Sequence, residues 1–253
     1  MDENKKKSSN DEIVISLDQF AVPGAIILAG VIIAVAIFFT NKNKDNNIDS
    51  GSDPVVAGEE IANDSEYQFA SASTDIGDGA YSGNKDTAKV AIVEFSDYLC
   101  GYCQRHVQDT YPDIIQNYID SGEVIYVYRE FSIHGEVADA QAMGGKCVFE
   151  QKGLDTYLEY HKNAFMLESI DAVYDVAQSA GANKADVKAC VESDKYRDAI
   201  DTDYQAGADA GVEGTPGFVI GTLDKDGNVT GKLVAGAYPY DAFVEVLDSL
   251  LAE

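Results

Sequence analysis

The stretch EFSDYLCGYCQRH, residues 94–106, contains two cysteines separated by two residues, directly after a short apolar segment. If a strand ends near Phe95, Cys100 lies near the N-terminus of the following helix, and Cys103 lies one turn further along. The unpaired N–H groups and the dipole of a helix N-terminus favour a thiolate at Cys100. Such a thiolate is a good leaving group and makes the disulfide oxidising. The spacing alone leaves three alternatives: a redox pair, half of a metal site or two buried thiols.

A zinc site at this pair would need further ligands nearby. The sequence has no second pair of cysteines with this spacing, and Cys147 and Cys190 are isolated from one another. The scattered histidines are each predicted on the surface or on a helix face: His106, His134 and His161. His106, three residues after Cys103, is predicted on the exposed side of its helix. We therefore expect a redox pair, with no metal and no cofactor.

Composition and charge exclude several classes of protein. With 45% hydrophobic residues, a chain of 253 residues can bury a core, and global disorder is not expected. The 44 acidic and 18 basic residues give a formal net charge of −26, which repels phosphate backbones. We expect no nucleic-acid partner, and we interpret the spread of acidic residues as a solvated surface.

Three segments precede the predicted folded domain. Residues 20–40 include FAVPGAIILAGVIIAVAIFF, which has no charged residue and as a helix would span about 30 Å, the thickness of a hydrocarbon core. No small-residue cleavage site follows, so the sequence predicts a single uncleaved transmembrane anchor. Residues 1–19 are predicted as a short cytoplasmic tail. Residues 41–78, rich in Asn, Asp, Ser and Gly, are predicted as a flexible polar linker.

The remaining residues, 79–253, are predicted to form one α/β domain. KVAIVEF (89–95) and EVIYVYREF (123–131) are predicted as strands, with a helix from Gly101 to about Asp120 between them. A helical block follows over about 136–210. GFVIG and GKLVAGA are predicted as two short strands before a terminal amphipathic helix. This order of elements indicates an α/β fold with a helical insertion.

Four segments carry a resemblance to a known family: Val90–Cys103, Val127–Gly135, Gly144–Gly153 and Gly211–Gly221. With the helical insertion before GTP, they resemble the DsbA-like thioredoxin-fold family of exported thiol–disulfide oxidoreductases. The resemblance covers the chain from about Gly79 to the C-terminus. It implies a thioredoxin-like fold, preceded here by the transmembrane helix and linker.

The resemblance also implies roles for five residues. Cys100 matches the nucleophile, and Cys103 matches the cysteine that resolves mixed disulfides. Pro216 matches the cis-proline that packs against the disulfide, and Thr215 before it tunes redox behaviour in the family. Glu94 matches a buried acidic residue that relays a proton to the resolving cysteine. A carboxylate inside an apolar strand is costly unless it is functional or paired. The alternatives are a solvated carboxylate at a strand edge and, for Pro216, a plain turn proline.

Several residues depart from the family pattern. Gly101 stands where proline is most frequent, and Ser132 replaces a frequent proline after the second strand. The chain also has no Trp, which the insertion usually carries. Because the dipeptide between the cysteines affects thiolate stability, Gly101 and Tyr102 leave the strength of oxidation open.

Cys147 and Cys190 both fall in predicted helices of the insertion. In an oxidising compartment, two helical cysteines packed face to face form a structural disulfide, and some members of the resembled family carry cysteines at similar positions. Closing a loop of about 44 residues contributes on the order of 4 kcal/mol in the entropic model. Two buried free thiols are the alternative.

The sequence therefore predicts a single-pass protein of the cell membrane with its catalytic domain on the extracytoplasmic side. The expected partners are exported proteins with free cysteines and a membrane protein that reoxidises the active site. A disulfide isomerase or reductase is the alternative within the same chemistry. A non-catalytic thioredoxin-fold binding module or metal chaperone is the alternative from another class.

Overall fold

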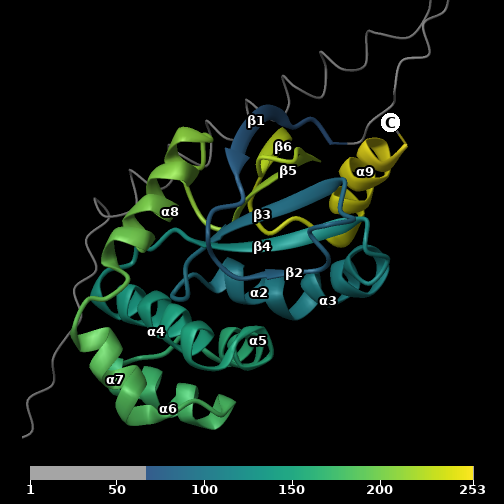
Figure 1. Ribbon diagram of the computed structural model, residues 1–253. Helices are drawn as coiled ribbons and strands as arrows, with labels where there is room; N and C mark the ends of the chain where they lie inside the picture. Colours follow the sequence, from purple (N-terminus) through teal and green to yellow (C-terminus); the bar gives the residue numbers. More distant parts are fainter. Residues whose placement is uncertain (1–66, 253) are drawn as a thin grey trace, which may run out of the picture. The chain divides into compact units, whose positions relative to one another are not determined.

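The computed structural model describes residues 67–252. In Figure 1 these residues form a six-stranded mixed sheet with helices packed on both faces. The strands are β1 (Ala70–Asp75), β2 (Tyr81–Ser82), β3 (Val90–Ser96), β4 (Val124–Glu130), β5 (Gly217–Leu223) and β6 (Asn228–Ala235). The helices are α2 (Gly101–Asp109), α3 (Tyr111–Ile114), the π-helical turn η2 (Ile115–Ile119), α4 (Glu136–Lys152), α5 (Leu154–Asn163), α6 (Ile170–Ala180), α7 (Lys184–Glu192), α8 (Arg197–Asp209) and α9 (Tyr240–Leu251).

The central strands β3 and β4 lie inside a sheet with the order β1-β6-β5-β3-β4-β2. β3 pairs parallel with β4 and antiparallel with β5. Every residue of β3 and β4 is buried, which agrees with the nearly continuous apolar sequence of both strands. The buried strand β3 leads into the turn that precedes α2, where Cys100 and Cys103 lie.

Alternate residues of β3 contact two different layers of helices. Ile92 packs with Phe218 of β5 and Phe243 of α9 in the core on one face of the sheet. Val93 packs on the other face, in a core that includes residues directly after α8. Because side chains alternate along a strand, Glu94 points to the same face as Ile92.

The helical insertion has a core of its own. Helices α4 to α8 occupy residues 136–209, within the range 136–210 that the sequence assigns to the insertion. Buried residues of α4, α5 and α6 pack there with Tyr98 and Cys103. Helix α8 then returns to the sheet, where a Cβ at Gly207 would lie 2.7 Å from Phe131 and 2.8 Å from Phe95. The missing side chain lets this helix approach the sheet closely.

Two predicted boundaries differ from the structure. The linker was expected to reach residue 78, but β1 (Ala70–Asp75) already belongs to the sheet and pairs antiparallel with β6. The sequence ASASTD has small and polar residues without apolar alternation, because this edge strand is mostly exposed. The expected helix to about Asp120 is interrupted at Thr110, and Pro112, which has no N–H to donate, lies in the first turn of α3.

The predicted transmembrane anchor at 20–40 and the predicted tail at 1–19 lie outside the described residues. Most of the predicted linker lies outside them as well. Over residues 67–252, the structure contains no helix of sufficient length and apolar character to cross a bilayer.

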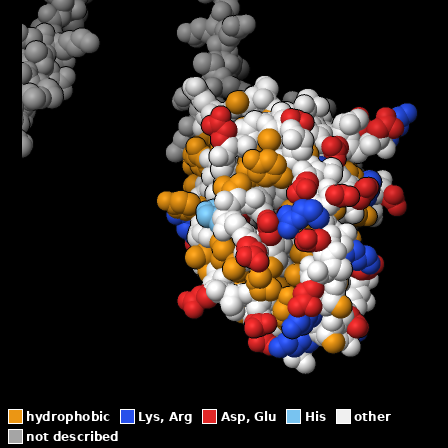
Figure 2. All heavy atoms as spheres, turned by 90° about the vertical axis from the view of Figure 1, so that its left-hand side faces the viewer, with side chains coloured by type: hydrophobic (Ala, Val, Ile, Leu, Met, Phe, Trp, Pro, Cys, Tyr) orange, Lys and Arg blue, Asp and Glu red, His pale blue; other side chains and the backbone are white. Residues whose placement is uncertain are grey.

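Acidic side chains on one face of the domain are scattered rather than gathered in one patch. Figure 2 shows this for the face that includes α4, α7 and α8, where Lys and Arg side chains lie among more numerous Asp and Glu side chains. Arg197, for example, lies 3.2 Å from Asp139 and 3.9 Å from Asp201. This distribution agrees with a solvated acidic surface.

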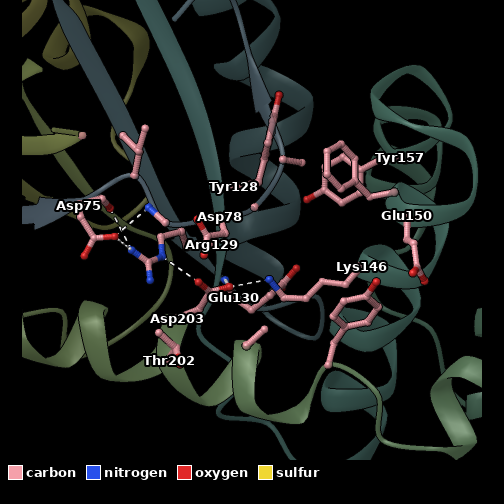
Figure 3. A pocket seen from close by; sticks show the side chains of 18 of the residues that line it. Asp75, Asp78, Tyr128, Arg129, Glu130, Lys146, Glu150, Tyr157, Thr202 and Asp203 are labelled. Atoms are coloured by element: carbon pink, nitrogen blue, oxygen red, sulfur yellow. Dashed lines mark hydrogen bonds and ion pairs between the residues drawn. The ribbon is translucent and has the colours of Figure 1, made fainter. Parts of the chain in front are cut away.

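A buried ion-pair network joins the sheet to the insertion beside a cavity of about 700 Å³ (Figure 3). Nε of Arg129 lies 2.8 Å from Oδ1 of Asp203, and Nζ of Lys146 lies 2.7 Å from Oδ2 of the same carboxylate. Arg129 also contacts Asp75 at 2.9 Å. Asp203 therefore compensates two cations from two different elements, β4 and α4.

Replacing Asp203 with Ala should destabilise the domain by about 3–5 kcal/mol, because Arg129 and Lys146 would stay buried without this carboxylate. The free energy of unfolding in urea measures the effect. Asp201→Ala, on the exposed side of the same helix, should change it by less than about 0.5 kcal/mol. Equal effects of the two substitutions would contradict the structural role of the network.

Candidate active site

Asp97 shapes the turn between β3 and α2. Its side chain is fully buried, and Oδ1 accepts a hydrogen bond from the N–H of Leu99 at 2.7 Å. Oδ2 accepts hydrogen bonds from the N–H groups of Ile133 and His134 at 2.6 and 3.1 Å. The carbonyl of Asp97 accepts the N–H of Cys100 at 3.1 Å. These bonds hold the turn against the loop after β4 and place Cys100 at the start of α2.

The two cysteines of the turn are free thiols in different environments. Cys100 is the N-cap residue of α2, with extended backbone angles, and Cys103 lies one turn inside the helix. Cys100 keeps 7% of its surface exposed, whereas Cys103 keeps none. A partner molecule can therefore reach only the sulfur of Cys100.

The loop before β5 lies against this sulfur. The Thr215–Pro216 peptide bond is cis, and the carbonyl of Thr215 accepts a hydrogen bond from Sγ of Cys100 at 3.2 Å. The antiparallel register of β3 and β5 places Phe95 opposite Gly217. The end of one strand thus lies beside the start of the other, and residues distant in sequence meet at the site.

The surroundings of Cys100 stabilise its thiolate. A hydrogen bond from the Cys103 thiol is the main cause that lowers the pKa of Cys100, to about 5. The Thr215 side chain and the N–H groups of Tyr102 and Cys103 add to this effect, while partial burial opposes it. These donors favour the charged form, as a helix N-terminus does for thiolates in general.

Burial raises the pKa of both Cys103 and Glu94, whereas the pKa of Cys100 is lowered. For Cys103, burial raises the pKa far above its ordinary value, and the Glu94 charge adds to the effect. Burial also raises the pKa of Glu94 to about 7, although a hydrogen bond from Tyr126 opposes the shift. Glu94 is fully buried, which excludes the solvated strand-edge alternative. A carboxyl group that titrates near neutrality beside a buried thiol is suited to exchange a proton with it.

Tyr126 and His106 are site residues that sequence reasoning missed. The Tyr126 hydroxyl donates to Oε2 of Glu94 at 2.7 Å, and Nε2 of His106 lies 2.9 Å from the same hydroxyl. His106 was predicted on the exposed side of its helix, but only 1% of it is exposed. Its three-residue spacing from Cys103 places both side chains on one inward face of α2, a signal that the sequence did contain.

Of the other two histidines, His161 differs from the predicted surface position, whereas His134 lies at the surface as predicted. His161 is buried, and its Nδ1 lies 3.0 Å from the hydroxyl of Tyr98, in the turn before Cys100. His134 is partly exposed, and its Nδ1 lies 2.9 Å from Oδ2 of Asp97. Over residues 67–252, no group of three or more His, Cys, Asp or Glu side chains is placed to hold a metal ion.

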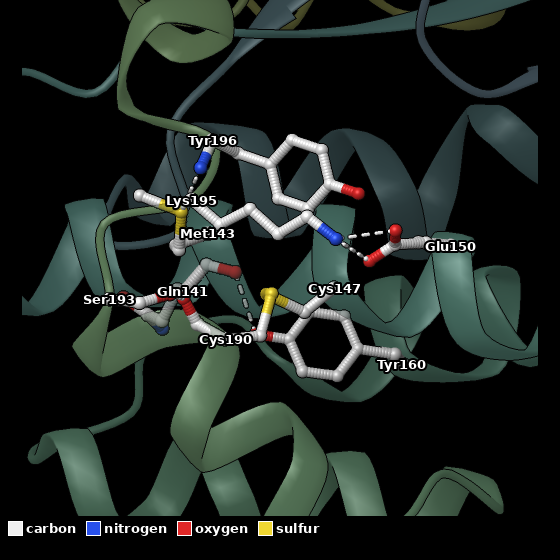
Figure 4. Close-up of a disulfide and its surroundings, with 9 residues drawn as sticks. All are labelled: Gln141, Met143, Cys147, Glu150, Tyr160, Cys190, Ser193, Lys195 and Tyr196. Atoms are coloured by element: carbon white, nitrogen blue, oxygen red, sulfur yellow. Dashed lines mark hydrogen bonds and ion pairs between the residues drawn. A yellow bond between two sulfur atoms is a disulfide. The ribbon is translucent and has the colours of Figure 1, made fainter.

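Cys147 and Cys190 form a disulfide that joins α4 to α7 (Figure 4). The distance between their Cα atoms is 6.1 Å. Beside it, Nζ of Lys195 lies 2.5 and 2.7 Å from the two carboxylate oxygens of Glu150. The pairing is the one expected from the sequence, and it excludes the alternative of two buried free thiols.

The fold and the site together define a class of protein. Thioredoxin-fold proteins have a pair of cysteines at the N-terminus of the helix that follows a central strand. This pair faces a loop that contains a cis-proline. The sequence profile of the thioredoxin family matches residues 76–238. The chain belongs to this family, and its resemblance to the DsbA-like members is confirmed.

Similar proteins come from several bacteria. A protein-disulfide oxidoreductase of Rickettsia felis is 25% identical over 182 residues, which cover 68% of this chain and 59% of the relative. The chain therefore spans less than two thirds of that relative. The thiol-disulfide exchange protein alpha-DsbA2 of Wolbachia pipientis is 25% identical over 68% of this chain and 87% of its own, with a TM-score of 0.56. Oxidised BdbD of Bacillus subtilis, 20% identical, matches the fold with a TM-score of 0.64 over 74% of this chain and 100% of its own.

Gly101→Pro should stabilise the protein by about 0.4–1 kcal/mol, because proline restricts the unfolded chain. Gly101 is the first residue of α2, a side chain there meets no atom within 4 Å, and Cys100 already has extended angles that suit a residue before proline. Urea denaturation of the reduced protein measures the change. A loss of stability would show that the start of the helix is strained, contrary to the geometry described.

Proposed function

We propose that this chain is a thiol–disulfide oxidoreductase that forms disulfides in exported proteins by exchange at Cys100 and Cys103. The observation that carries the proposal is the contrast between the two sulfurs: the pKa of Cys100 is lowered to about 5, and burial raises that of Cys103. A stable thiolate at Cys100 favours the reduced form, and this makes the disulfide a strong oxidant. The names of the relatives support the same chemistry.

The proposed exchange begins when a substrate thiolate attacks Sγ of Cys100. The bond between Cys100 and Cys103 breaks, a mixed disulfide forms at Cys100, and Cys103 leaves as a thiolate. Protonated Glu94 gives its proton to this buried thiolate. A second substrate thiolate then attacks the substrate sulfur of the mixed disulfide and releases Cys100 as a thiolate. Two electrons thus pass from two substrate thiols to the original disulfide.

The cis-proline loop is the proposed site of substrate docking. The Thr215 backbone lies next to Cys100, where an extended peptide can add as a strand along the loop. Cys100 is the sulfur that such a peptide would meet. In this proposal Thr215 and Pro216 position the substrate and tune the potential, and they take no part in bond making.

The proposal includes attachment to the membrane. The uncharged stretch within residues 20–40 supports a single anchor, with residues 1–19 in the cytoplasm and the thioredoxin domain on the extracytoplasmic side. An oxidising compartment also agrees with the Cys147–Cys190 disulfide. Each turnover leaves Cys100 and Cys103 reduced, so a reoxidising partner in the membrane completes the cycle.

Two alternatives make different predictions. A reductase or isomerase would have a potential near that of thioredoxin, about −270 mV, whereas an oxidant would lie near −120 mV. A binding module or metal chaperone would keep its function without Cys100. The lowered pKa of Cys100 favours the oxidant over both.

The full chain in its disulfide form should oxidise a reduced, unfolded test protein that contains two cysteines. Mass spectrometry after acid quenching should detect the substrate disulfide, and a Cys100→Ser variant should form none. A Lys188→Ala variant, which changes the exposed side of α7, serves as the matched control and should oxidise at the rate of the original chain. A potential near −270 mV with no substrate oxidation would contradict the proposed direction.

A further inference from the structure

The proton of the Tyr126 hydroxyl fixes the direction of a buried hydrogen-bond chain. This hydroxyl has one proton, which it donates to Oε2 of Glu94 at 2.7 Å. Its oxygen must then accept a hydrogen bond from Nε2 of His106, 2.9 Å away. Burial lowers the pKa of His106 to about 3, so the ring is neutral and its single proton is on Nε2. The chain therefore runs from His106 through Tyr126 to Glu94.

Packing holds the His106 ring in this orientation. The ring centroid lies 4.5 Å from that of Phe218 and 5.3 Å from that of Phe243. Its Nδ1 is buried and has no hydrogen-bond partner among the described residues. A ring enclosed by aromatic side chains cannot pass a proton to solvent through Nδ1. It serves as a fixed donor.

The two oxygens of Glu94 therefore differ. Oε2 accepts the Tyr126 hydroxyl, whereas Oε1 is buried with no hydrogen-bond partner in the described part of the chain. An unpaired buried carboxylate oxygen is costly, and a proton on it removes most of the cost. The charge of Glu94 also acts on the buried Cys103 thiol, which indicates that the two groups lie close together.

Resting on the proposed function, we propose that Tyr126 and His106 are positioning residues for proton exchange between Glu94 and Cys103. Their chain occupies Oε2 and leaves Oε1 as the atom that exchanges the proton. When the disulfide opens, the O–H bond at Oε1 breaks, an S–H bond forms at Cys103, and Glu94 becomes a carboxylate. The Tyr126 hydroxyl then stabilises the new charge. On reoxidation the proton returns to Oε1.

The hydrogen bonds from His106 through Tyr126 should also determine the pH at which Glu94 gives up its proton. A donor to the charged form lowers a carboxyl pKa, so Tyr126, with a smaller contribution from the Ser96 side chain, keeps the pKa of Glu94 near 7 against the effect of burial. The other ionisable groups that interact with Glu94 are Cys100 at the N-cap of α2, Cys103 of α2, Tyr111 of α3, Glu130 of β4 and Tyr157 of α5.

The titration of Glu94 in the full chain tests this proposal. In the disulfide form neither active-site sulfur titrates, and NMR of glutamate labelled with carbon-13 at Cδ follows the carboxyl group, assigned with a Glu94→Gln variant. Tyr126→Phe should raise the pKa of Glu94 by about one to two units, because it removes a hydrogen bond to a charged group. His106→Leu should raise it less, and His106→Gln, which can keep a donor near the Nε2 position, should restore the original value.

Tyr128→Phe is the matched control. Tyr128 lies on the same strand, opposite Glu94 in the pairing of β3 with β4, and is 4% exposed, but its hydroxyl contacts Oγ of Ser82 at 2.8 Å and the hydroxyl of Tyr111 rather than the Glu94 carboxyl group. This variant should leave the pKa of Glu94 within about 0.3 units of its original value. An unchanged titration in Tyr126→Phe would overturn the proposal. An equal shift in Tyr128→Phe would also overturn it, because the effect would then be one of packing.

A kinetic measurement separates this proposal from the proposed function. The rate at which a small thiolate opens the Cys100–Cys103 disulfide should fall above the pKa of Glu94, once the ionisation of the attacking thiol is divided out. In Tyr126→Phe this fall should move to higher pH by the shift seen in the NMR titration. A profile that Glu94→Gln leaves unchanged would overturn proton transfer by Glu94. The proposed exchange at Cys100 would fail separately, if Cys100→Ser still oxidised the test protein.

Discussion

The hydrogen bond from the Cys103 thiol to the sulfur of Cys100 is the interaction on which the proposed chemistry depends. It requires one sulfur at the surface and a second one directly behind it, as one turn of α2 provides. It also requires Cys103 to keep its proton, and burial ensures this by raising its pKa. The same geometry therefore makes one cysteine a thiolate and the other a thiol.

A buried carboxyl group beside this pair adds an electrostatic constraint. If Glu94 were charged at all pH values, it would oppose ionisation of both sulfurs. With a pKa of about 7, Glu94 can keep its proton while Cys103 is in the disulfide and transfer it when Cys103 becomes a thiolate. The buried charges of Arg129 and Asp203, by contrast, form an ion pair. Among residues 67–252 the hydrogen-bond donors to Glu94 are neutral, which agrees with a functional role rather than a structural one.

Local patterns were sufficient to predict the parts of the structure that depend on few neighbours. The apolar runs predicted β3 and β4, and the spacing of Cys100 and Cys103 predicted a helix N-terminus. The family resemblance supplied Pro216 and Glu94. The pairing of Tyr126 with His106 could not be predicted in this way, because it joins a strand to a helix only after both pack on one face of the sheet. β1 was missed because an exposed edge strand carries no apolar alternation.

The most direct test of the central claim compares the stability of the reduced and oxidised forms as a function of pH. The folded-state pKa of Cys100, about 5, lies below the value of about 8.5 for an unfolded cysteine, so thiolate stabilisation is complete above the unfolded value and is lost as pH falls through 5. In the oxidised form Cys100 does not titrate. The account predicts that, as the pH is lowered from 8 to 4.5, the free energy of unfolding of the reduced form decreases steadily relative to that of the oxidised form. A difference that does not change over this range would contradict it.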